Sequence, residues 1–290
     1  MKIGLQLHPD IKKSRNVLME ILDFLVNSGH QIYISEQVAE HYKPLIEDIN
    51  YTTPEECISA IDVMLSIGGD GTFLGGLRMI RGTNIPILGI HLGGLGFLAD
   101  LSTENYKERL KALFAGEYHI EERYSLEAKL IPAQDEEKYW GTNEFHIDKG
   151  NVMNMIKIRT FVDNEYLNTY RADGLLISSP TGSTAYGLSA GGPIISPGLD
   201  VISISPICPH SLSARPVIIS GEQEVEIDSS QFNDDESLVI DGFQRVSLKE
   251  VNKVVIKRSS DTFKIIRFED ESFFQTLRKK LNWGVDSRGN

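Results

Sequence analysis

Short apolar runs alternate with amphipathic stretches along the first hundred residues of the chain. The apolar runs cover 3–7, 31–34, 63–67 and 85–90, and stretches with helical spacing cover 12–27, 54–60 and 72–81. Strands that alternate with helices in this way are typical of a parallel sheet covered by helices. The pattern predicts a Rossmann-like α/β domain over residues 1–100.

Beyond residue 116 the pattern changes to alternation of apolar and polar positions, as in 124–131, 225–227 and 254–257. A period of two residues, interrupted by Gly, Asn and Pro, indicates strands with one buried face. Several such segments predict an all-β domain, a β-sandwich, over residues 101–267. A helix is expected at 105–114, where the chain leaves the first domain.

The end of the chain predicts one more helix, at 272–281. Its apolar side carries Phe273, Phe274, Leu277 and Leu281, and its last turn is basic. Basic side chains suit the negative end of the helix dipole, and an apolar side needs a surface to cover it. The tail, 268–290, is therefore expected to pack back on the first domain.

Composition and charge exclude several classes of protein. With 290 residues the chain has the length of about two domains, and its net charge of -12 argues against a nucleic-acid partner. Cys57 and Cys208 are far apart and indicate buried free thiols, and the histidines lack metal-ligand spacing. Without a signal-like N-terminus or a run of ~18 apolar residues, a cytoplasmic protein with no membrane contact is expected.

A predicted buried strand runs directly into three glycines, Gly68, Gly69 and Gly71, that surround Asp70. Glycines let backbone N–H groups approach phosphate oxygens, and the carboxyl edge of a parallel sheet is where ligands bind. A carboxylate at such a place either holds a metal or takes a proton from a hydroxyl, and both tasks belong to phosphoryl transfer. The alternative is an ordinary turn in which Asp70 caps the next helix.

The stretch 171–193 is dense in small polar residues. After a predicted strand at 174–177, Pro180 and Gly182 indicate a loop, and Ser183 or Thr184 is expected to cap a short helix. Hydroxyls and free amides beside the ring of Tyr186 suit a purine nucleoside, which needs a stacking face and small hydrogen-bonding groups. The alternative is a flexible Ser/Gly loop.

A third element is the pair Asn143-Glu144 in a strand-like context. The hydroxyls of a ribose can donate to a carboxylate, while an amide both accepts and donates. The pair alone is weak, because two polar residues at a strand end are more often a solvated turn.

These segments together resemble the NAD kinase family over essentially the whole chain. The resemblance depends on the runs 68–72 (GGDGT), 92–98 (LGGLGFL), 143–144 (NE), 173–174 (DG) and 179–186 (SPTGSTAY), and on their order and spacing. It implies a two-domain NAD kinase-like fold. It also implies transfer of the γ-phosphoryl group of ATP to the 2′-hydroxyl of the adenosine ribose of NAD, with a divalent metal such as magnesium.

The resemblance further implies roles for particular residues. Asp70 is expected to be the catalytic base, and phosphate is expected at Gly68, Gly69, Gly71 and Thr72. NAD is expected to contact Asp70, Gly71, Asn143, Glu144, Asn154, Arg171, Asp173, Thr181, Thr184, Ala185, Tyr186, Gly187, Leu188, Ser189 and Gln244. In this family a neighbouring subunit can complete the site, so a homo-oligomer, a tetramer or a dimer, is expected.

The chain also departs from the family pattern. Many members have a basic residue shortly after the glycine turn, where this chain has Gly75, with Arg78 one helical turn further on. The competing interpretations are a lipid or sugar-phosphate kinase of the same superfamily and a nucleotide sensor without catalysis. The lipid-kinase alternative lacks its Asn-Glu pair directly after 68–72. Donor range, the choice between NAD and NADH, feedback regulation and the role of His91 are not fixed by the sequence.

Overall fold

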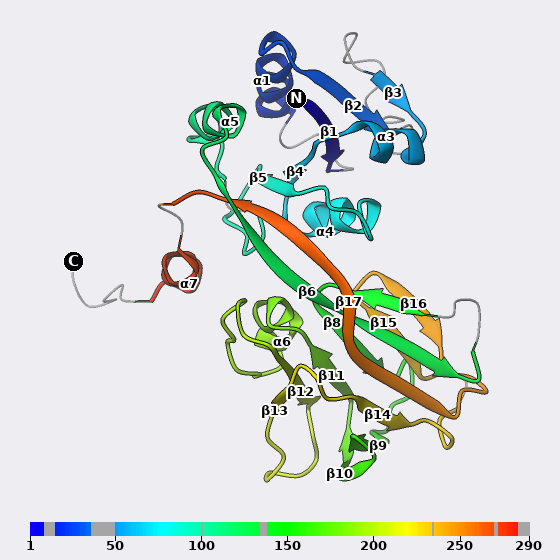
Figure 1. Ribbon diagram of the computed structural model, residues 1–290. Helices are drawn as coiled ribbons and strands as arrows, with labels where there is room; N and C mark the ends of the chain where they lie inside the picture. Colours follow the sequence, from blue (N-terminus) through cyan, green and yellow to red (C-terminus); the bar gives the residue numbers. More distant parts are fainter. Residues whose placement is uncertain are drawn as a thin grey trace. The chain divides into compact units, whose positions relative to one another are not determined.

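The computed structural model describes residues 1–8, 15–35, 50–99, 101–133, 138–233, 235–269 and 272–283 (Figure 1). The chain divides into two compact units: unit 1 holds residues 1–122 and 263–290, and unit 2 holds residues 123–262. The sequence placed the domain boundaries at 100 and 267. The structure divides the chain after residue 122 instead of 100 and after residue 262 instead of 267. The helix predicted where the chain leaves the first domain therefore belongs to unit 1.

In its described residues, unit 1 holds five parallel strands, five helices, the start of β6 and the end of β17. Its strands are β1 (Lys2–Leu7), β2 (Gln31–Ser35), β3 (Asn50–Thr52), β4 (Val63–Gly68) and β5 (Ile87–His91). Its helices are α1 (Arg15–Asn27), α3 (Pro54–Ala60), α4 (Asp70–Met79), α5 (Tyr106–Ala115) and α7 (Phe273–Leu281). Residues 12–14 of the first predicted helix and residues 270–271 and 284–290 of the predicted tail lie outside the described ranges.

The order of the strands places a ligand edge in unit 1. The parallel strands follow the order β5-β4-β1-β2-β3, and β17 (Lys253–Arg267) joins β5 through the pair Ile265 and Ile87. The chain therefore adds β2 and β3 on one side of β1, and then adds β4 and β5 on its other side. In open α/β sheets the crevice beside such a reversal, at the carboxyl ends of the strands, is where ligands bind. Asp70 follows β4 directly at this edge.

Helices cover both faces of the unit 1 sheet. Leu18, Leu22 and Leu25 of α1 share one buried cluster with Leu110 of α5 and the inward side chains of β1. On the other face, a Cβ on Gly76 of α4 would lie 2.8 Å from Ile87, so glycine lets this helix approach the strands closely. The predicted Rossmann-like arrangement is confirmed. No helix in the described ranges has the length and apolarity needed to span a membrane.

Unit 2 consists of strands with two short helical segments. The strands are β6 (His119–Ile131), β7 (Tyr139–Gly141), β8 (Glu144–Asp148), β9 (Ile156–Val162), β10 (Glu165–Ala172), β11 (Gly174–Ser178), β12 (Val201–Ile207), β13 (Val217–Ser220), β14 (Val225–Asp228), β15 (Ser237–Ile240), β16 (Gln244–Ser247) and most of β17. The helical segments are the 3-10 turn η1 (Thr181–Thr184) and α6 (Tyr186–Ser189).

These strands form two layers. One layer runs β10-β9-β14-β17, with β6 paired to β17 and β7 paired to β6, and the other runs β13-β12-β11-β8-β15-β16. Inward side chains of both layers, such as Ile158 and Ile256 from the first and Phe145 and Leu175 from the second, share one buried cluster. Alternating residues that meet between two sheets are the core of a β-sandwich, as the sequence predicted.

One expectation about the cysteines is wrong. Cys57 is a buried free thiol as predicted, but Cys208 is exposed. Cys208 comes directly after Ile207, the last residue of β12, and its backbone adopts a φ of 45°. The chain turns there, so the side chain leaves the alternation that would have buried it between the sheets.

Candidate functional site

Asp70 is the first residue of α4, and three backbone amides of the loop after β5 hold its carboxylate. The N–H of Phe97 donates to Oδ2 at 3.0 Å, and those of Leu98 and Ala99 donate to Oδ1 at 3.1 and 3.2 Å. A carboxylate offers about four acceptor positions, so these bonds leave about one for a further donor. The arrangement fixes the direction of the carboxylate and suits a general base.

Two glycines make this arrangement possible. A Cβ on Gly96 would lie 2.1 Å from Oδ1 of Asp70, and one on Gly68 would lie 2.3 Å from Oγ1 of Thr72. Both distances are far shorter than van der Waals contact. Thr72 is only 6% exposed, because its hydroxyl is packed against Gly68. Its backbone N–H, rather than its hydroxyl, is therefore the group that suits a phosphate.

The glycine turn is shorter than the sequence predicted. Gly68 still belongs to β4 and α4 begins at Asp70, so Gly69 alone connects strand and helix. Gly69 is the N-cap and offers no side chain to the first N–H groups of the helix. Such N–H groups, at the positive end of the helix dipole, favour an anion. The alternative in which Asp70 caps the helix is wrong, since Gly69 holds that position.

In unit 2, a second carboxylate fixes the turn that carries Asn143 and Glu144. The N–H of Thr142 donates to Oδ2 of Asp241 at 2.9 Å, and those of Asn143 and Glu144 donate to Oδ1 at 2.7 and 3.2 Å. Asp241 begins the connection between β15 and β16, and Gly242 follows it. Sequence reasoning missed Asp241 as a supporting residue. An Asp-Gly pair between two strand-like runs, a common hairpin signal, was the available clue.

The side chains of Asn143 and Glu144 are buried, at 7% and 4% exposed. Oδ1 of Asn143 and Oε2 of Glu144 nevertheless have no hydrogen-bond partner among the described residues. Buried polar atoms are nearly always paired, so two unpaired ones side by side point to a ligand. Burial also contradicts the alternative of a solvated turn.

Burial raises the pKa of Glu144 to about 8, with the negative charge of Asp241 acting in the same direction and a hydrogen bond from the backbone of Tyr186 opposing it. At neutral pH most of this carboxyl is therefore protonated. A protonated carboxyl can both donate and accept a hydrogen bond, which suits a sugar hydroxyl.

The loop after β11 packs directly against this turn. The N–H of Ser179 donates to the carbonyl oxygen of Asn143 at 2.9 Å, and its Oγ donates to that of Thr142 at 2.7 Å. A Cβ on Gly182 would lie 2.1 Å from the same Asn143 oxygen, so glycine is required there. Unit 2 thus brings the predicted nucleoside loop, residues 181–189, together with Asn143 and Glu144.

The predicted cap of the short helix is wrong. The N-cap of α6 is Ala185, which makes no side-chain capping bond. The hydroxyl of Ser183 instead donates to the carbonyl of Pro180 at 2.7 Å and accepts the N–H of Ile195 at 3.0 Å. Thr184 Oγ1 donates to the carbonyl of Thr181 at 3.1 Å. These hydroxyls complete the loop itself, because the 3-10 turn uses them before α6 begins.

Tyr186 offers a partly open ring beside the buried pair. It is 43% exposed and meets the ring of His146 edge-on, with the centroids 5.5 Å apart and the planes at 75°. Burial lowers the pKa of His146, which favours the neutral imidazole. The sequence showed only that His146 lacks metal-ligand spacing, and its contact with Tyr186 gives it a part in positioning that ring.

The other predicted residues are more dispersed. Asp173 pairs with Lys149, Nζ to Oδ1 at 2.7 Å, and its negative charge is among those that act with burial to raise the pKa of Tyr186. Arg171 is exposed at the end of β10. Asn154 is exposed and lines a separate cavity of about 250 Å³. Gln244 is the first residue of β16, just after the hairpin that carries Asp241.

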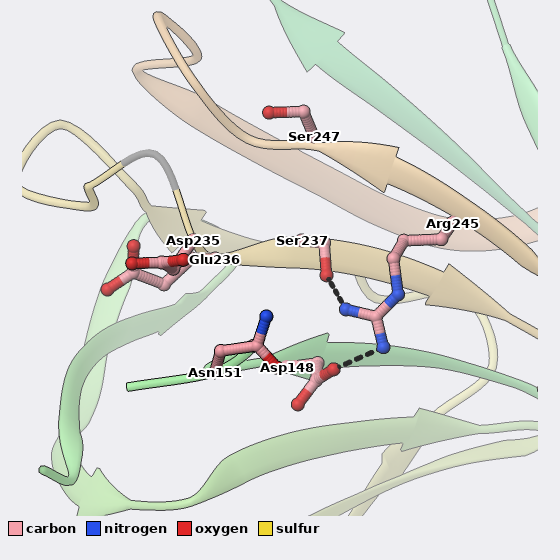
Figure 2. Close-up of a pocket in the computed structure, with 8 residues that line it drawn as sticks. Asp148, Asn151, Asp235, Glu236, Ser237, Arg245 and Ser247 are labelled. Atoms are coloured by element: carbon pink, nitrogen blue, oxygen red, sulfur yellow. Dashed lines mark hydrogen bonds and ion pairs between the residues drawn. The ribbon is translucent and has the colours of Figure 1, made fainter. Parts of the chain in front are cut away.

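A pocket of about 650 Å³ opens at the other end of β8 (Figure 2). Arg245 crosses it, with Nη2 2.6 Å from Oδ2 of Asp148 and Nη1 donating to Oγ of Ser237 at 2.5 Å. The remaining lining residues are Gly150, Asn151, Asp235, Glu236 and Ser247. Sequence reasoning did not single out this pocket, because its residues come from three strands and the connections between them and carry no motif.

Unit 1 is a doubly wound sheet with a carboxylate and uncapped helix amides at its switch point, and unit 2 is a β-sandwich with a buried polar cluster. These two features are typical of a protein that binds phosphate and nucleoside groups. Residues 3–118 match the ATP-NAD kinase N-terminal domain family, and residues 142–268 match the ATP-NAD kinase C-terminal domain family. The chain belongs to the NAD kinase family.

Individual relatives agree over most of the chain. An NAD kinase of Clostridium botulinum (strain Kyoto) is 38% identical over 97% of this chain and 96% of its own, and one of Bacteroides fragilis is 42% identical over 78% of each. The crystal structure of an NAD kinase from Archaeoglobus fulgidus in complex with ATP has a TM-score of 0.76 at 25% identity, covering 97% and 99% of the two chains. Yeast NADH kinase complexed with NADH has the same fold, with a TM-score of 0.88 at 23% identity over 100% and 90%.

Proposed function

We propose that this protein transfers the γ-phosphoryl group of ATP to the 2′-hydroxyl of the adenosine ribose of NAD, giving NADP and ADP. The observation that carries the proposal is the carboxylate of Asp70, oriented by three N–H bonds to its two oxygens, in a chain of this family. A protein that only sensed the nucleotide would not need a positioned proton acceptor.

Asp70 accepts the proton of the 2′-hydroxyl as that oxygen attacks phosphorus. Phosphoryl transfer depends on positioning and on neutralising charge, with little covalent help from the protein. Amides that fix the carboxylate before substrate arrives remove the cost of orienting it during the reaction. The uncapped N–H groups at the start of α4, after Gly69, bind an oxygen of the transferred group.

The cluster of unit 2 holds the acceptor. Tyr186 stacks on the adenine, and Asn143 and Glu144 bind ribose hydroxyls through the two atoms that lack a protein partner within the described residues. Thr181, the segment 184–189 and Asp173 surround the rest of the nucleoside. Arg171, Asn154 and Gln244 stay proposals based on the family resemblance alone.

A divalent cation such as Mg²⁺ belongs to this proposal as part of the nucleotide substrate. In the ranges that the structure describes, no three His, Cys, Asp or Glu side chains are grouped to hold a metal ion. Asp70 is part of no such group. These residues do not form a metal site of their own, so no step is assigned to a metal bound by protein side chains. Removing divalent cations with EDTA should stop turnover, and added Mg²⁺ should restore it.

A homo-oligomer, a tetramer or a dimer, is also part of the proposal. Its structural support is two exposed apolar side chains of unit 2: Ile218, on the edge strand β13, is 49% exposed, and Leu212, in the connection before β13, is 92% exposed. Large apolar side chains next to a strand edge are typical of a surface that pairs with another copy. Sedimentation at several protein concentrations tests this, and a monomer at every concentration would contradict it.

The proposed location is the cytoplasm, where NAD and ATP are made and used. Both cysteines are free thiols, which suits a reducing compartment. Fractionation of the source cells, followed by detection of the protein, tests this.

The activity itself is tested by incubating the purified protein with NAD, ATP and Mg²⁺ and measuring NADP with a strictly NADP-dependent dehydrogenase. Formation of NADP at the rate of ADP release supports the proposal. ADP release without NADP would indicate another acceptor, and neither product would indicate a sensor. Repeating the assay with NADH, other triphosphates and polyphosphate defines the acceptor and donor range.

A further inference from the structure

Lys280, in the last turn of α7, lies beside Asp70 although 210 positions separate them in the printed sequence. Its Nζ is 3.8 Å from Oδ2 of Asp70 and 4.8 Å from the centre of the Phe97 ring. Phe97 is also the residue whose N–H donates to Oδ2 at 3.0 Å. The ammonium group therefore stands on the Oδ2 side of the carboxylate, where the face of the Phe97 ring supports it.

The helix that Asp70 begins offers little positive charge of its own. Its residue 75 is glycine, and Arg78 is its one basic residue. Arg78 extends along α4, with Nη2 3.8 Å from the place of a Cβ on Gly75, one turn of helix beyond Asp70. Among the described residues, Lys280 alone has a cationic group within 4 Å of the Asp70 carboxylate.

The contact is not built to hold the fold together. The side chains of Lys280 and Asp70 remain 32% and 33% exposed, and ion pairs this open to water contribute little to stability. The helix is instead anchored by Leu277, which is 2% exposed. The lysine stem is flexible and its ammonium is a compact charge, so the group can follow an anion that arrives next to Asp70.

The distances around a general base indicate which anion the ammonium group of Lys280 can contact. A general base lies roughly 3 Å from the hydroxyl oxygen it deprotonates, and that oxygen lies roughly 3–3.5 Å from the phosphorus it attacks. The ammonium of Lys280 starts 3.8 Å from the base on a flexible stem, so it can turn to contact oxygens on a phosphorus at that distance.

We propose that Lys280 is a further catalytic residue, whose ammonium group contacts the oxygens of the phosphoryl group in transfer. This inference rests on the proposed function. In the step itself, the 2′-oxygen of NAD forms a bond to the γ-phosphorus and its proton passes to Asp70. The bond from that phosphorus to the β–γ bridging oxygen breaks, and ADP leaves with the electron pair. Lys280 keeps its protons and offsets the negative charge of the group in transfer.

The test compares Lys280→Met with Lys279→Met, a neighbouring lysine that is exposed on the same helix. Lys280→Met should lower kcat by at least ~10²-fold, the effect of losing one preorganised donor to a transition state, with KM for NAD and the thermal midpoint nearly unchanged. Lys279→Met should stay within about twofold of the wild type. Lys280→Arg should retain part of the activity, and ethylammonium ions should partly rescue Lys280→Ala.

The other possible results of these comparisons would overturn the role proposed for Lys280. Wild-type kcat in Lys280→Met would overturn the inference, and so would a raised kcat, which would make Lys280 a restraint on Asp70. Loss of kcat together with a lowered thermal midpoint, with no rescue by arginine or amine, would show a structural role and also overturn it. If the wild-type protein itself makes no NADP, the proposed function fails instead, and that result is separate from these comparisons.

Discussion

Gly96 and Asp70 are in such close contact that a single methyl group would separate them: a Cβ on Gly96 would lie 2.1 Å from Oδ1 of the carboxylate. The same loop supplies the three N–H groups that orient Asp70. The position of the proposed base therefore depends on the absence of a side chain at residue 96.

Replacing Gly96 with alanine should push the Asp70 carboxylate out of its amide cradle and lower turnover by roughly 10-fold or more, since small displacements of a catalytic group are costly. Gly94→Ala is the matched control, because a Cβ there meets nothing within 4 Å. Steady-state kinetics on both variants checks this. Equal activity in the two would mean that the cradle tolerates displacement and that its geometry is not needed.

Glu144→Gln should change how stability depends on pH. The unfolded pKa is 4.5 and the folded pKa is raised to about 8. The proton held by the folded state stabilises it fully below pH 4.5, and this contribution is lost as pH rises through 8. Glutamine cannot titrate, so wild-type stability should fall relative to the variant by roughly 1–2 kcal/mol between pH 6 and 8. Urea unfolding at several pH values measures this, and parallel curves would contradict the buried, protonated carboxyl.

Tyr186→Ala should weaken NAD more than ATP. The ring is 43% exposed and supported at its edge by His146, so removing it takes away a stacking face without opening the core. Loss of base stacking typically costs ~1–3 kcal/mol, about 5- to 150-fold in affinity. Calorimetric titration with each nucleotide separates the two effects. An equal loss for both would assign Tyr186 to a shared site or to the fold.

Elements set by local signals were predictable from the sequence. Helix α3 begins at Pro54 because Thr53 and Glu56 form a reciprocal capping box, and both residues are visible in the sequence. The strand ending at Gly68 was equally visible, since a continuous apolar run bounded by glycine is typical of a central parallel strand.

The supports of the candidate site were not predictable in the same way. Asp241 and Asn143 are 98 positions apart, and Asp70 and Phe97 are 27 apart, so no local pattern links them. Lys280 appeared in the sequence only as part of a basic helix end, which the helix dipole explains sufficiently. Sequence motifs marked the residues proposed to meet substrate and also the run 92–98, but the contact of that run with Asp70 and of Asp241 with Asn143 emerged only when the chain was folded.

The most direct test of the account is the turnover of Asp70→Asn beside its affinity for NAD. The amide oxygen of asparagine can still accept the N–H groups of Leu98 and Ala99 at the Oδ1 position, although its NH2 group cannot accept that of Phe97. With two of the three bonds kept, the loop should remain in place. Asparagine cannot take a proton from the 2′-hydroxyl.

The account predicts that Asp70→Asn binds NAD within about threefold of the wild type, keeps its thermal midpoint and loses at least ~10²-fold in kcat, the low end for a positioned general base. Calorimetry and the NADP assay on the same preparation give both numbers. Near-normal kcat in a folded variant that binds NAD would contradict the assignment of Asp70 as the base.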